Sequence, residues 1–269
     1  MPPIILASVN LKGGVGKTAL AVNFAAYCGS IGKKTLLIDL DPQTNATFSC
    51  MDVAVWEQHA RDHGTVADLL GARSHSNAEG NTKTAQDVIR TGVFANVDLI
   101  PSHLDLFSVD LDLSSATARE TRLRRSVQPI LNDYDIVVCD CPPNLTIPTQ
   151  NALALSTHYV VPISPDFLSG IGVALLLTRV GEFSRELEHQ IVHAGIVISR
   201  FGRPAMHRDM TVESIRTAFP GLVLDQMIHD RVKVSEAAAK QKSVFQIGDP
   251  EAAAEFTAVA KDLIERLGA

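Results

Sequence analysis

Short, nearly continuous apolar runs recur along the chain, and longer segments with helical periodicity lie between them. The runs span residues 4–9, 35–38, 97–100, 136–139, 159–163 and 195–198. Strands that are buried on both faces have this continuous character. Helical patterns cover residues 17–30, 117–131, 169–187, 207–218 and 251–267. This alternation predicts an α/β fold in which a doubly wound, mostly parallel sheet is flanked by helices.

The last helical segment has one apolar face and could in principle pack on the sheet or lie on a membrane. Its apolar face comprises Phe256, Val259, Ala260, Leu263, Ile264 and Leu267. Its charges are Glu251, Glu255, Asp262 and Glu265 against Lys261 and Arg266. Anionic lipid repels a net negative helix. We therefore expect this helix to pack on the sheet, and we expect no membrane partner.

Composition adds bounds to this fold. The chain has 269 residues and a net charge of −6, which suits a single domain over residues 1–269 and argues against a wholesale nucleic-acid coat. The polar segment 72–85 is expected to be a surface excursion. The four cysteines, Cys28, Cys50, Cys139 and Cys141, have no disulfide-framework spacing. With no signal-peptide layout at the start, we expect a cytoplasmic protein.

A glycine-rich loop follows the first predicted strand and leads into the first helix. It reads Lys12-Gly13-Gly14-Val15-Gly16-Lys17-Thr18, although Leu11 occupies the first glycine position of the usual phosphate-loop pattern. Glycines let backbone N–H groups turn toward phosphate oxygens, and the helix N-terminus favours an anion. Lys17 is expected to reach the β- and γ-phosphates, and the Thr18 hydroxyl to ligate Mg²⁺. The predicted nucleotide-binding residues are Lys12, Gly13, Gly14, Val15, Gly16, Lys17, Thr18 and Ala19.

Acidic residues end two further predicted strands. Asp39 and Asp41 follow one apolar run, and Asp140 follows another. Ligands of open α/β sheets bind at the carboxyl ends of the strands, and an aspartate at such an end commonly holds Mg²⁺, directly or through water. Each aspartate alone could be an ordinary turn residue. Together with the glycine-rich loop they predict a nucleotide and magnesium site.

These motifs together resemble the ParA/MinD family of deviant Walker-A P-loop ATPases, and the resemblance covers essentially the whole chain. They are "KGGVGKT" at 12–18, "LIDLDPQTNAT" at 37–47, "VVCDCPPNL" at 137–145 and "KVSEA" at 233–237. The extra lysine that defines the family corresponds to Lys12, and the ParA branch does not require the glycine that Leu11 replaces.

The resemblance implies a mechanism with ATP and Mg²⁺ as cofactors. Two subunits would enclose two ATP molecules, and Lys12 of one subunit would cross to the phosphates held by the other, like an arginine finger supplied in trans. Lys12, Lys17 and Asp41 would be the catalytic residues, with Asp41 orienting the attacking water. Thr18, Asp39 and Asp140 would be on the magnesium side.

Four departures from the family pattern concern the surroundings of the site. One is that "PPNLT" at 142–146 replaces the family's "PPSLG". Ala19 replaces a second threonine of the phosphate loop, and Thr44 replaces a glycine, which would alter the mobility of that loop. Residues 228–230 replace the "IPR" of relatives, near where the adenine lies in them.

The resemblance also implies partners. Members of the ParA branch without an N-terminal helix-turn-helix domain bind nonspecific DNA as ATP dimers and are released when a ParB-like or cargo-adaptor protein stimulates hydrolysis, which is otherwise weak. Such a protein would be associated with the nucleoid and would segregate or space a plasmid, chromosome or protein cargo.

A local basic bias supports DNA binding. Residues 199–242 hold eight basic and five acidic side chains, a local charge of +3. The candidate DNA contacts are Arg203, Arg208, Arg231 and Lys233. An ordinary solvated surface is the alternative interpretation.

Two other functions within the same broad family stay open. A MinD-like ATPase would bind a membrane through a basic amphipathic C-terminus, which the acidic last helix does not provide. A relative of the nitrogenase iron protein would hold an iron–sulfur cluster between subunits through cysteines. Cys139 and Cys141 flank Asp140, but the C-terminal CPxC of cluster carriers is absent.

Overall fold

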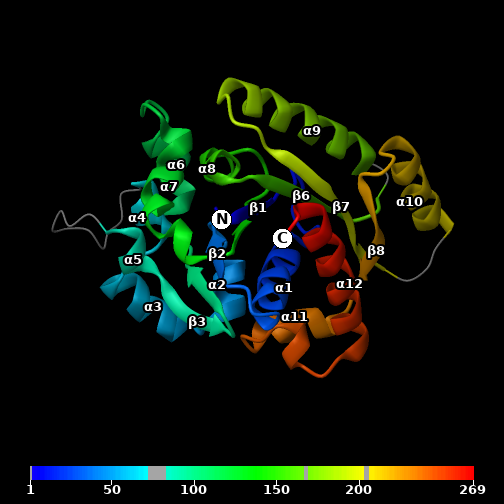
Figure 1. Cartoon of the computed structure of the whole chain (residues 1–269), viewed down its shortest axis with the longest axis horizontal. Helices are drawn as coiled ribbons and strands as arrows, with labels where there is room; N and C mark the ends of the chain where they lie inside the picture. The colour runs from blue at the N-terminus through cyan, green and yellow to red at the C-terminus, as the bar shows by residue number, and fades with distance from the viewer. Residues whose placement is uncertain (1, 72–82, 167–168, 203–205) are drawn as a thin grey trace.

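The computed structural model describes residues 2–71, 83–166, 169–202 and 206–269 (Figure 1). Most of the predicted excursion at 72–85 lies outside these ranges. The described residues form an eight-stranded sheet in the order β3-β4-β2-β5-β1-β6-β7-β8. The strands are β1 (Ile4–Ser8), β2 (Thr35–Asp39), β3 (Arg90–Phe94), β4 (Val97–Ile100), β5 (Ile136–Asp140), β6 (His158–Ile163), β7 (Val192–Phe201) and β8 (Val223–His229). Neighbouring strands are parallel except for the antiparallel pair β3 and β4, which confirms the predicted α/β fold.

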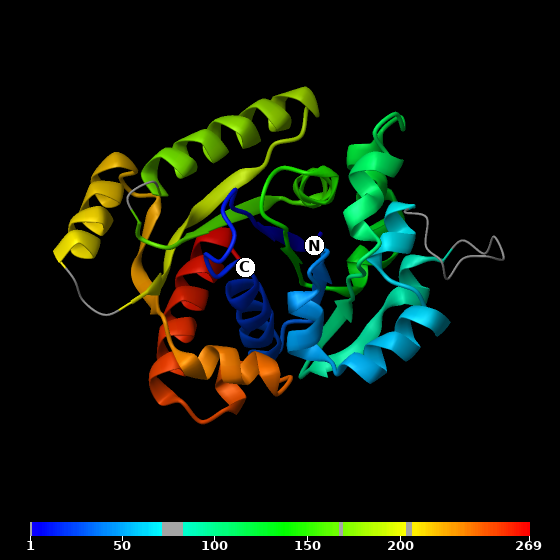
Figure 2. The ribbon, with the colours of Figure 1, turned by 180° about the vertical axis from the view of Figure 1, so that it is seen from behind.

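Helices cover both faces of the sheet. They are α1 (Lys17–Ser30), α2 (Asn45–Cys50), α3 (Val53–Asp62), α4 (Val66–Leu70), α5 (Ala85–Val88), α6 (Leu106–Asp112), α7 (Arg122–Val127), α8 (Ile147–Leu155), α9 (Ser169–Glu186), α10 (Met206–Ala218), α11 (Val232–Ala239) and α12 (Pro250–Leu267). Helices α8 and α9 lie on the opposite side of the sheet from α1 and α12 (Figures 1 and 2). The two layers bury the sheet, which explains why its strands read as continuous apolar runs.

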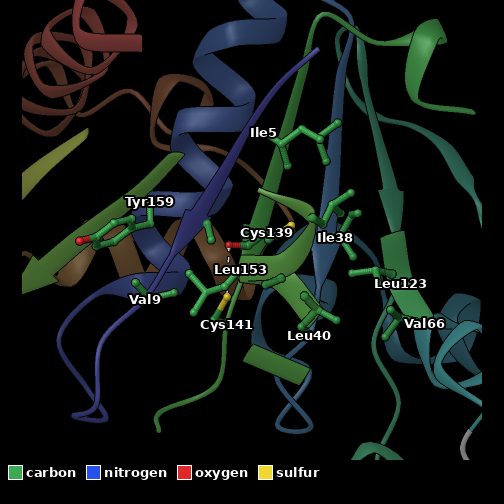
Figure 3. Close-up of a cluster of buried hydrophobic side chains, with 14 of the residues drawn as sticks. Ile5, Val9, Ile38, Leu40, Val66, Leu123, Cys139, Cys141, Leu153 and Tyr159 are labelled. Carbon is green, nitrogen blue, oxygen red and sulfur yellow. Dashed lines mark hydrogen bonds between the residues drawn. The ribbon is translucent and has the colours of Figure 1, made fainter. Parts of the chain in front are cut away.

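Alternate residues of each central strand point to opposite faces. In β1, Ile5 and Ala7 join the core beneath α8 and α9, whereas Leu6 joins the core beneath α1 and α12. Figure 3 shows part of the first core, in which Ile5, Ile38, Cys139 and Leu153 lie together. The two cores fix the strands, and therefore the loops at their carboxyl ends.

Helix α1 passes unusually close to the turn between β3 and β4. A Cβ added at Gly29 would lie 2.1 Å from the carbonyl oxygen of Ala95, so only glycine fits there. This close approach holds the helix that begins at the phosphate loop against the sheet.

Some elements differ from the sequence-based expectation. The helix predicted over 117–131 is broken into 3₁₀ turns at Arg119–Thr121 and Gln128–Asp133 on either side of α7, and Pro129 at the start of the second turn removes a backbone donor. Strands β3 and β8 were not predicted because each carries exposed polar residues, Arg90 and Thr91 in one and Asp225 and Gln226 in the other.

The last helix packs as predicted. Phe256, Val259, Leu263 and Leu267 of α12 are at most 6% exposed, and the helix contacts α1, β7 and β8. Its apolar face is therefore inside the protein. Among the described residues, no helix is long and apolar enough to cross a bilayer.

Candidate nucleotide-binding site

The glycine-rich loop joins β1 to α1 at the carboxyl edge of the sheet. Gly14 and Gly16 have φ angles of +73° and +86°, in the left-handed region that favours glycine. In this conformation Gly16 is the N-cap residue of α1. The loop thus bends sharply and presents the N-terminus of a 14-residue helix at its end.

The backbone N–H groups of this loop make no hydrogen bonds to the described part of the protein. Within the part of the chain that the structure describes, no protein acceptor bonds the N–H of Gly13, Gly14, Val15, Gly16, Lys17, Thr18 or Ala19. Unpaired N–H groups in succession at a helix N-terminus form an anion-binding concavity. The arrangement suits the oxygens of a polyphosphate.

The carbonyl groups of the same loop are bonded. Lys17 Nζ donates to the Lys12 carbonyl at 3.0 Å, and Arg200 donates to the Gly14 carbonyl at 2.9 Å. The Ser199 hydroxyl donates to the Val15 carbonyl. The loop is therefore held through its carbonyl groups while its N–H groups stay available.

The two lysines of the loop occupy different environments. Lys17 is 6% exposed, and burial lowers its pKa while Asp140, Cys141 and Asp41 oppose that shift. The Lys12 side chain is 56% exposed and pairs with Asp166, which follows β6. The Ser164 hydroxyl also donates to the Asp166 carboxylate. Lys17 thus faces the loop's own concavity, whereas Lys12 lies at its surface.

Strand pairing brings the predicted magnesium-side aspartates together. In the β2–β5 register, Asp39 lies opposite Asp140, and both are fully buried. The Thr47 N–H and hydroxyl donate to Asp39 at 2.8 and 2.7 Å, and the Asp41 N–H donates at 3.1 Å. Burial raises the pKa of Asp39 to about 7, although these hydrogen bonds lower it. Asp39 is therefore a satisfied carboxyl in the wall of the site.

Asp140 is different, because neighbouring groups offset the burial of its carboxyl group only in part. Burial raises the pKa of Asp140 well above its usual value, the charge of Asp39 raises it further, and the nearby Thr18 hydroxyl opposes the shift. Neither oxygen of Asp140 has a hydrogen-bond partner of ordinary geometry among the described residues. A cation with its bound waters would satisfy both oxygens.

These residues fit Mg²⁺. No three His, Cys, Asp or Glu side chains form a metal cage in the described ranges. Mg²⁺ needs no such cage, because it keeps several waters and takes one or two protein oxygens plus phosphate oxygens. Asp140 and the Thr18 hydroxyl supply suitable oxygens beside the phosphate loop.

Asp41 lies at the start of the loop after β2. The Gln43 N–H donates to its Oδ1 at 2.9 Å, and the Ser102 hydroxyl donates to its carbonyl at 2.6 Å. No donor in the described ranges bonds its Oδ2, so that oxygen can accept a hydrogen bond from a water. Thr44, which replaces the family's glycine, has φ of +59°, a left-handed conformation that costs a threonine about 1–2 kcal/mol.

A cavity of about 760 Å³ extends from the phosphate loop to residues 228–231. Its walls come from the loop, α1, α2, the end of β8 and α11, and they include Lys17, Asp41, Phe48, Arg200, Asp230, Arg231 and Ser235. The volume is within the range of ordinary ligand pockets. A nucleotide can thus extend from the loop toward residues 228–231.

Comparisons with known proteins agree with this geometry. A family model described as an AAA domain matches residues 4–193. The chromosome-partitioning ATPase Soj of Treponema pallidum is 34% identical over 233 residues, covering 86% of this chain and 85% of that protein. The cell division protein PomZ of Myxococcus xanthus is 31% identical over 261 residues, covering 96% of this chain and 77% of that protein. This chain belongs to the ParA/MinD family of P-loop ATPases.

A solved structure shares the whole fold. The structure of the ATP complex of an aspartate-to-alanine variant of Cyanothece McdA superposes with a TM-score of 0.80 at 18% identity, covering 99% of this chain and 96% of that one. At this identity the likeness concerns the fold alone. It agrees with the parallel sheet and flanking helices described above.

The cysteines beside Asp140 lie inside the sheet. Cys139 and Cys141 are both 0% exposed, and burial raises the pKa of Cys139 to about 12. Such thiols do not reach a surface where two subunits could share a metal cluster.

The residues that the sequence predicts to contact DNA come from different segments of this chain. Lys233 lies in the first turn of α11, and its exposed side chain pairs with Glu236 at 2.8 Å. Arg231 lines the cavity and pairs with Glu251 and Glu255 of α12. The Arg208 guanidinium lies against Gly202. Arg203 is outside the described residues.

Three residues of the site were not assigned to it from the sequence. Asp166 contacts Lys12, Ser199 contacts Val15, and Arg200 contacts Gly14. Each follows or ends a parallel strand at the carboxyl edge, β6 or β7, as the predicted aspartates do. A polar residue at such a strand end was the available signal.

Proposed function

We propose that this chain is an ATP-dependent partitioning or positioning ATPase whose two subunits associate around ATP and Mg²⁺. The observation that carries the proposal is the contrast between the loop's lysines. Lys17 is buried at its own phosphate cradle, whereas Lys12 is exposed beside the same cradle. An exposed cation at the mouth of the site can reach the phosphates of a second subunit, which the buried one cannot.

In this proposal each side chain has a defined task. The N–H groups of the loop and Lys17 would hold the phosphates, and the Thr18 hydroxyl and Asp140 would hold the hydrated Mg²⁺. Asp39 lies opposite Asp140 on the neighbouring strand, on the magnesium side. The metal offsets phosphate charge when bound. Asp41 orients the attacking water through its unbonded oxygen. Lys12 of the partner places positive charge where the transition state develops negative charge.

The dimer is proposed to bind DNA without sequence preference. Lys233 and Arg208 are the leading contacts, and Arg203, five residues before Arg208 in the sequence, is a third. Arg231 contributes less, because Glu251 and Glu255 already balance its charge. Hydrolysis is weak alone and is stimulated by a ParB-like or cargo-adaptor protein, so that release from DNA moves a cargo over the nucleoid in the cytoplasm.

The direct test is ATP-driven dimerisation. We expect the wild-type mass to double in light scattering with ATP and Mg²⁺ but not with ADP, and Lys12→Ala to stay monomeric while still binding ATP. Lys261→Ala, which removes an exposed lysine from α12, is the matched control and should dimerise normally. A Lys12→Ala protein that dimerises as well as the control would contradict the role of Lys12 in trans.

A further inference from the structure

The end of β7 contacts the phosphate loop, although the two segments are more than 180 residues apart in the sequence. The Ser199 hydroxyl donates to the Val15 carbonyl, and Arg200 NH1 donates to the Gly14 carbonyl at 2.9 Å. Two successive residues of a strand thus bond two successive carbonyls of the loop. The Gly16 position is equally close, because a Cβ there would lie 3.0 Å from Ser199 Oγ.

Peptide geometry gives these contacts a consequence for phosphate binding. In a planar trans peptide the carbonyl and the N–H of the next residue point in opposite directions. A donor that bonds the Gly14 carbonyl therefore directs the Val15 N–H the other way. A donor on the Val15 carbonyl does the same for the Gly16 N–H. Neither N–H group has a hydrogen-bond acceptor among the described residues.

The backbone at Arg200 is strained where these contacts are made. Arg200 has φ of +51°, a left-handed conformation that a long side chain rarely adopts. Its Nε also approaches Asp230 Oδ1 at 3.4 Å, at the other end of the cavity wall. Strained residues that persist in this way cluster at functional sites.

We propose that Ser199 and Arg200 are positioning residues for nucleotide binding, which orient the Gly14–Val15 and Val15–Gly16 peptides so that their N–H groups face the phosphates. They act through the loop and not by touching the nucleotide. The proposal rests on the proposed function, because it concerns the same phosphate-binding loop. In this proposal the end of β7 holds the loop in its phosphate-binding conformation before the nucleotide binds.

The test compares polyphosphate binding among four variants. Calorimetry would measure the Kd of inorganic tripolyphosphate, with Mg²⁺, and of ATP. Ser199→Ala and Arg200→Met each remove one donor, and each should weaken both ligands by about fivefold, the scale of one lost hydrogen bond. Ser199→Thr and Arg200→Lys keep a donor and should restore most of the affinity. Each Tm should stay near that of the wild type, which separates the effect from unfolding.

Arg200→Gly gives a second, opposite signature. Glycine tolerates the left-handed conformation, so this variant should melt no lower than Arg200→Met. It should nevertheless bind tripolyphosphate as weakly as Arg200→Met, because the donor is gone. Asp225→Ala, which removes a 91% exposed carboxylate of β8 that does not line the cavity, is the control and should leave tripolyphosphate binding unchanged.

The outcomes separate this proposal from the proposed function. If the wild type fails to bind ATP, the proposed function itself is wrong. If the wild type binds ATP but Ser199→Ala keeps full tripolyphosphate affinity, the orienting role is overturned. Loss in the Arg200 variants alone would then mean that the guanidinium contacts phosphate directly, because Ser199 carries no charge that could do so.

Discussion

Lys12 and Lys17 of the phosphate loop carry the same functional group but have different surroundings. Lys17 donates to the Lys12 carbonyl inside the site, whereas the Lys12 ammonium pairs with Asp166 at the surface. An exposed ion pair of this kind contributes only about 0–1 kcal/mol. Lys12 can therefore leave Asp166 for a stronger anion, such as the polyphosphate of a second subunit, at little cost.

Asp41 offers a residue-scale test of the reaction. Asp41→Ala removes the carboxylate that we expect to orient water, but leaves the phosphate loop intact. Hydrolysis should fall by at least about a hundredfold, the usual scale of such a group, while ATP binding persists and the ATP dimer accumulates. Phosphate release and light scattering measure the two effects.

The control for this substitution is Asp225→Ala, since that side chain is 91% exposed on β8. It should leave the ATPase rate unchanged. Brisk turnover by Asp41→Ala, at the rate of the control, would remove Asp41 from the reaction.

At the scale of elements, strand β7 carries a partly buried polar side chain that has no hydrogen-bond partner among the described residues. Neither ring nitrogen of His193 has a hydrogen-bond partner in the described residues, and its ring packs 4.8 Å from that of Tyr159. Burial lowers the pKa of His193 to about 4, and the charge of Arg266 on α12 adds to the shift. The imidazole is therefore neutral in the folded protein at pH 5 and above.

This shift predicts acid sensitivity. Between pH 6.5 and 4 the unfolded chain binds a proton on His193 that the folded chain does not, so the free energy of unfolding falls as the pH falls. The loss from pH 7 to pH 5 is up to about 2 kcal/mol from this residue. His193→Phe, which keeps a ring against Tyr159, should show a smaller loss.

Urea unfolding at pH 7 and pH 5 measures the difference. His189→Phe is unsuitable as a control, because His189 bonds the Ser156 carbonyl at 2.8 Å. The control is His63→Phe, since His63 directly follows helix α3 and lies away from β7. An equal acid-dependent loss in His193→Phe and the wild type would mean that other groups account for it.

At the scale of the whole molecule, the net charge of −6 coexists with a local charge of +3 over residues 199–242. DNA binding by such a molecule depends on counterion release at a local patch. Dimerisation doubles the patch, so we expect binding with ATP and little with ADP. Affinity should fall steeply as the salt concentration rises.

Fluorescence anisotropy with two unrelated duplexes measures this prediction. Lys233→Ala should weaken both duplexes equally and reduce the salt slope by about two for a dimer, one unit for each lost phosphate contact. Lys261→Ala is again the matched control. Equal binding with ADP and ATP would contradict an ATP-dependent DNA-bound dimer.

Much of this architecture could be predicted from local sequence. Helix α1 runs from Lys17 to Ser30 as predicted, because the glycine-rich loop fixes its start and its residues are apolar nearly all round. The position of Asp39 and Asp140 on one edge follows from two strands that end in aspartate within a parallel sheet, although their direct pairing is seen only in the structure. Strand β8 escaped prediction because its exposed Asp225 and Gln226 interrupt the apolar run.

The sequence by itself determined which groups could bind phosphate and magnesium, since Lys17, Thr18, Asp39 and Asp140 lie in short motifs whose chemistry does not depend on distant residues. Only the tertiary structure decided what holds those groups in place. Asp166 reaches Lys12 across 154 residues, and Ser199 reaches Val15 across 184. The physical reason is that parallel strands far apart in sequence end at one edge of the sheet, and no local pattern specifies which ends become neighbours.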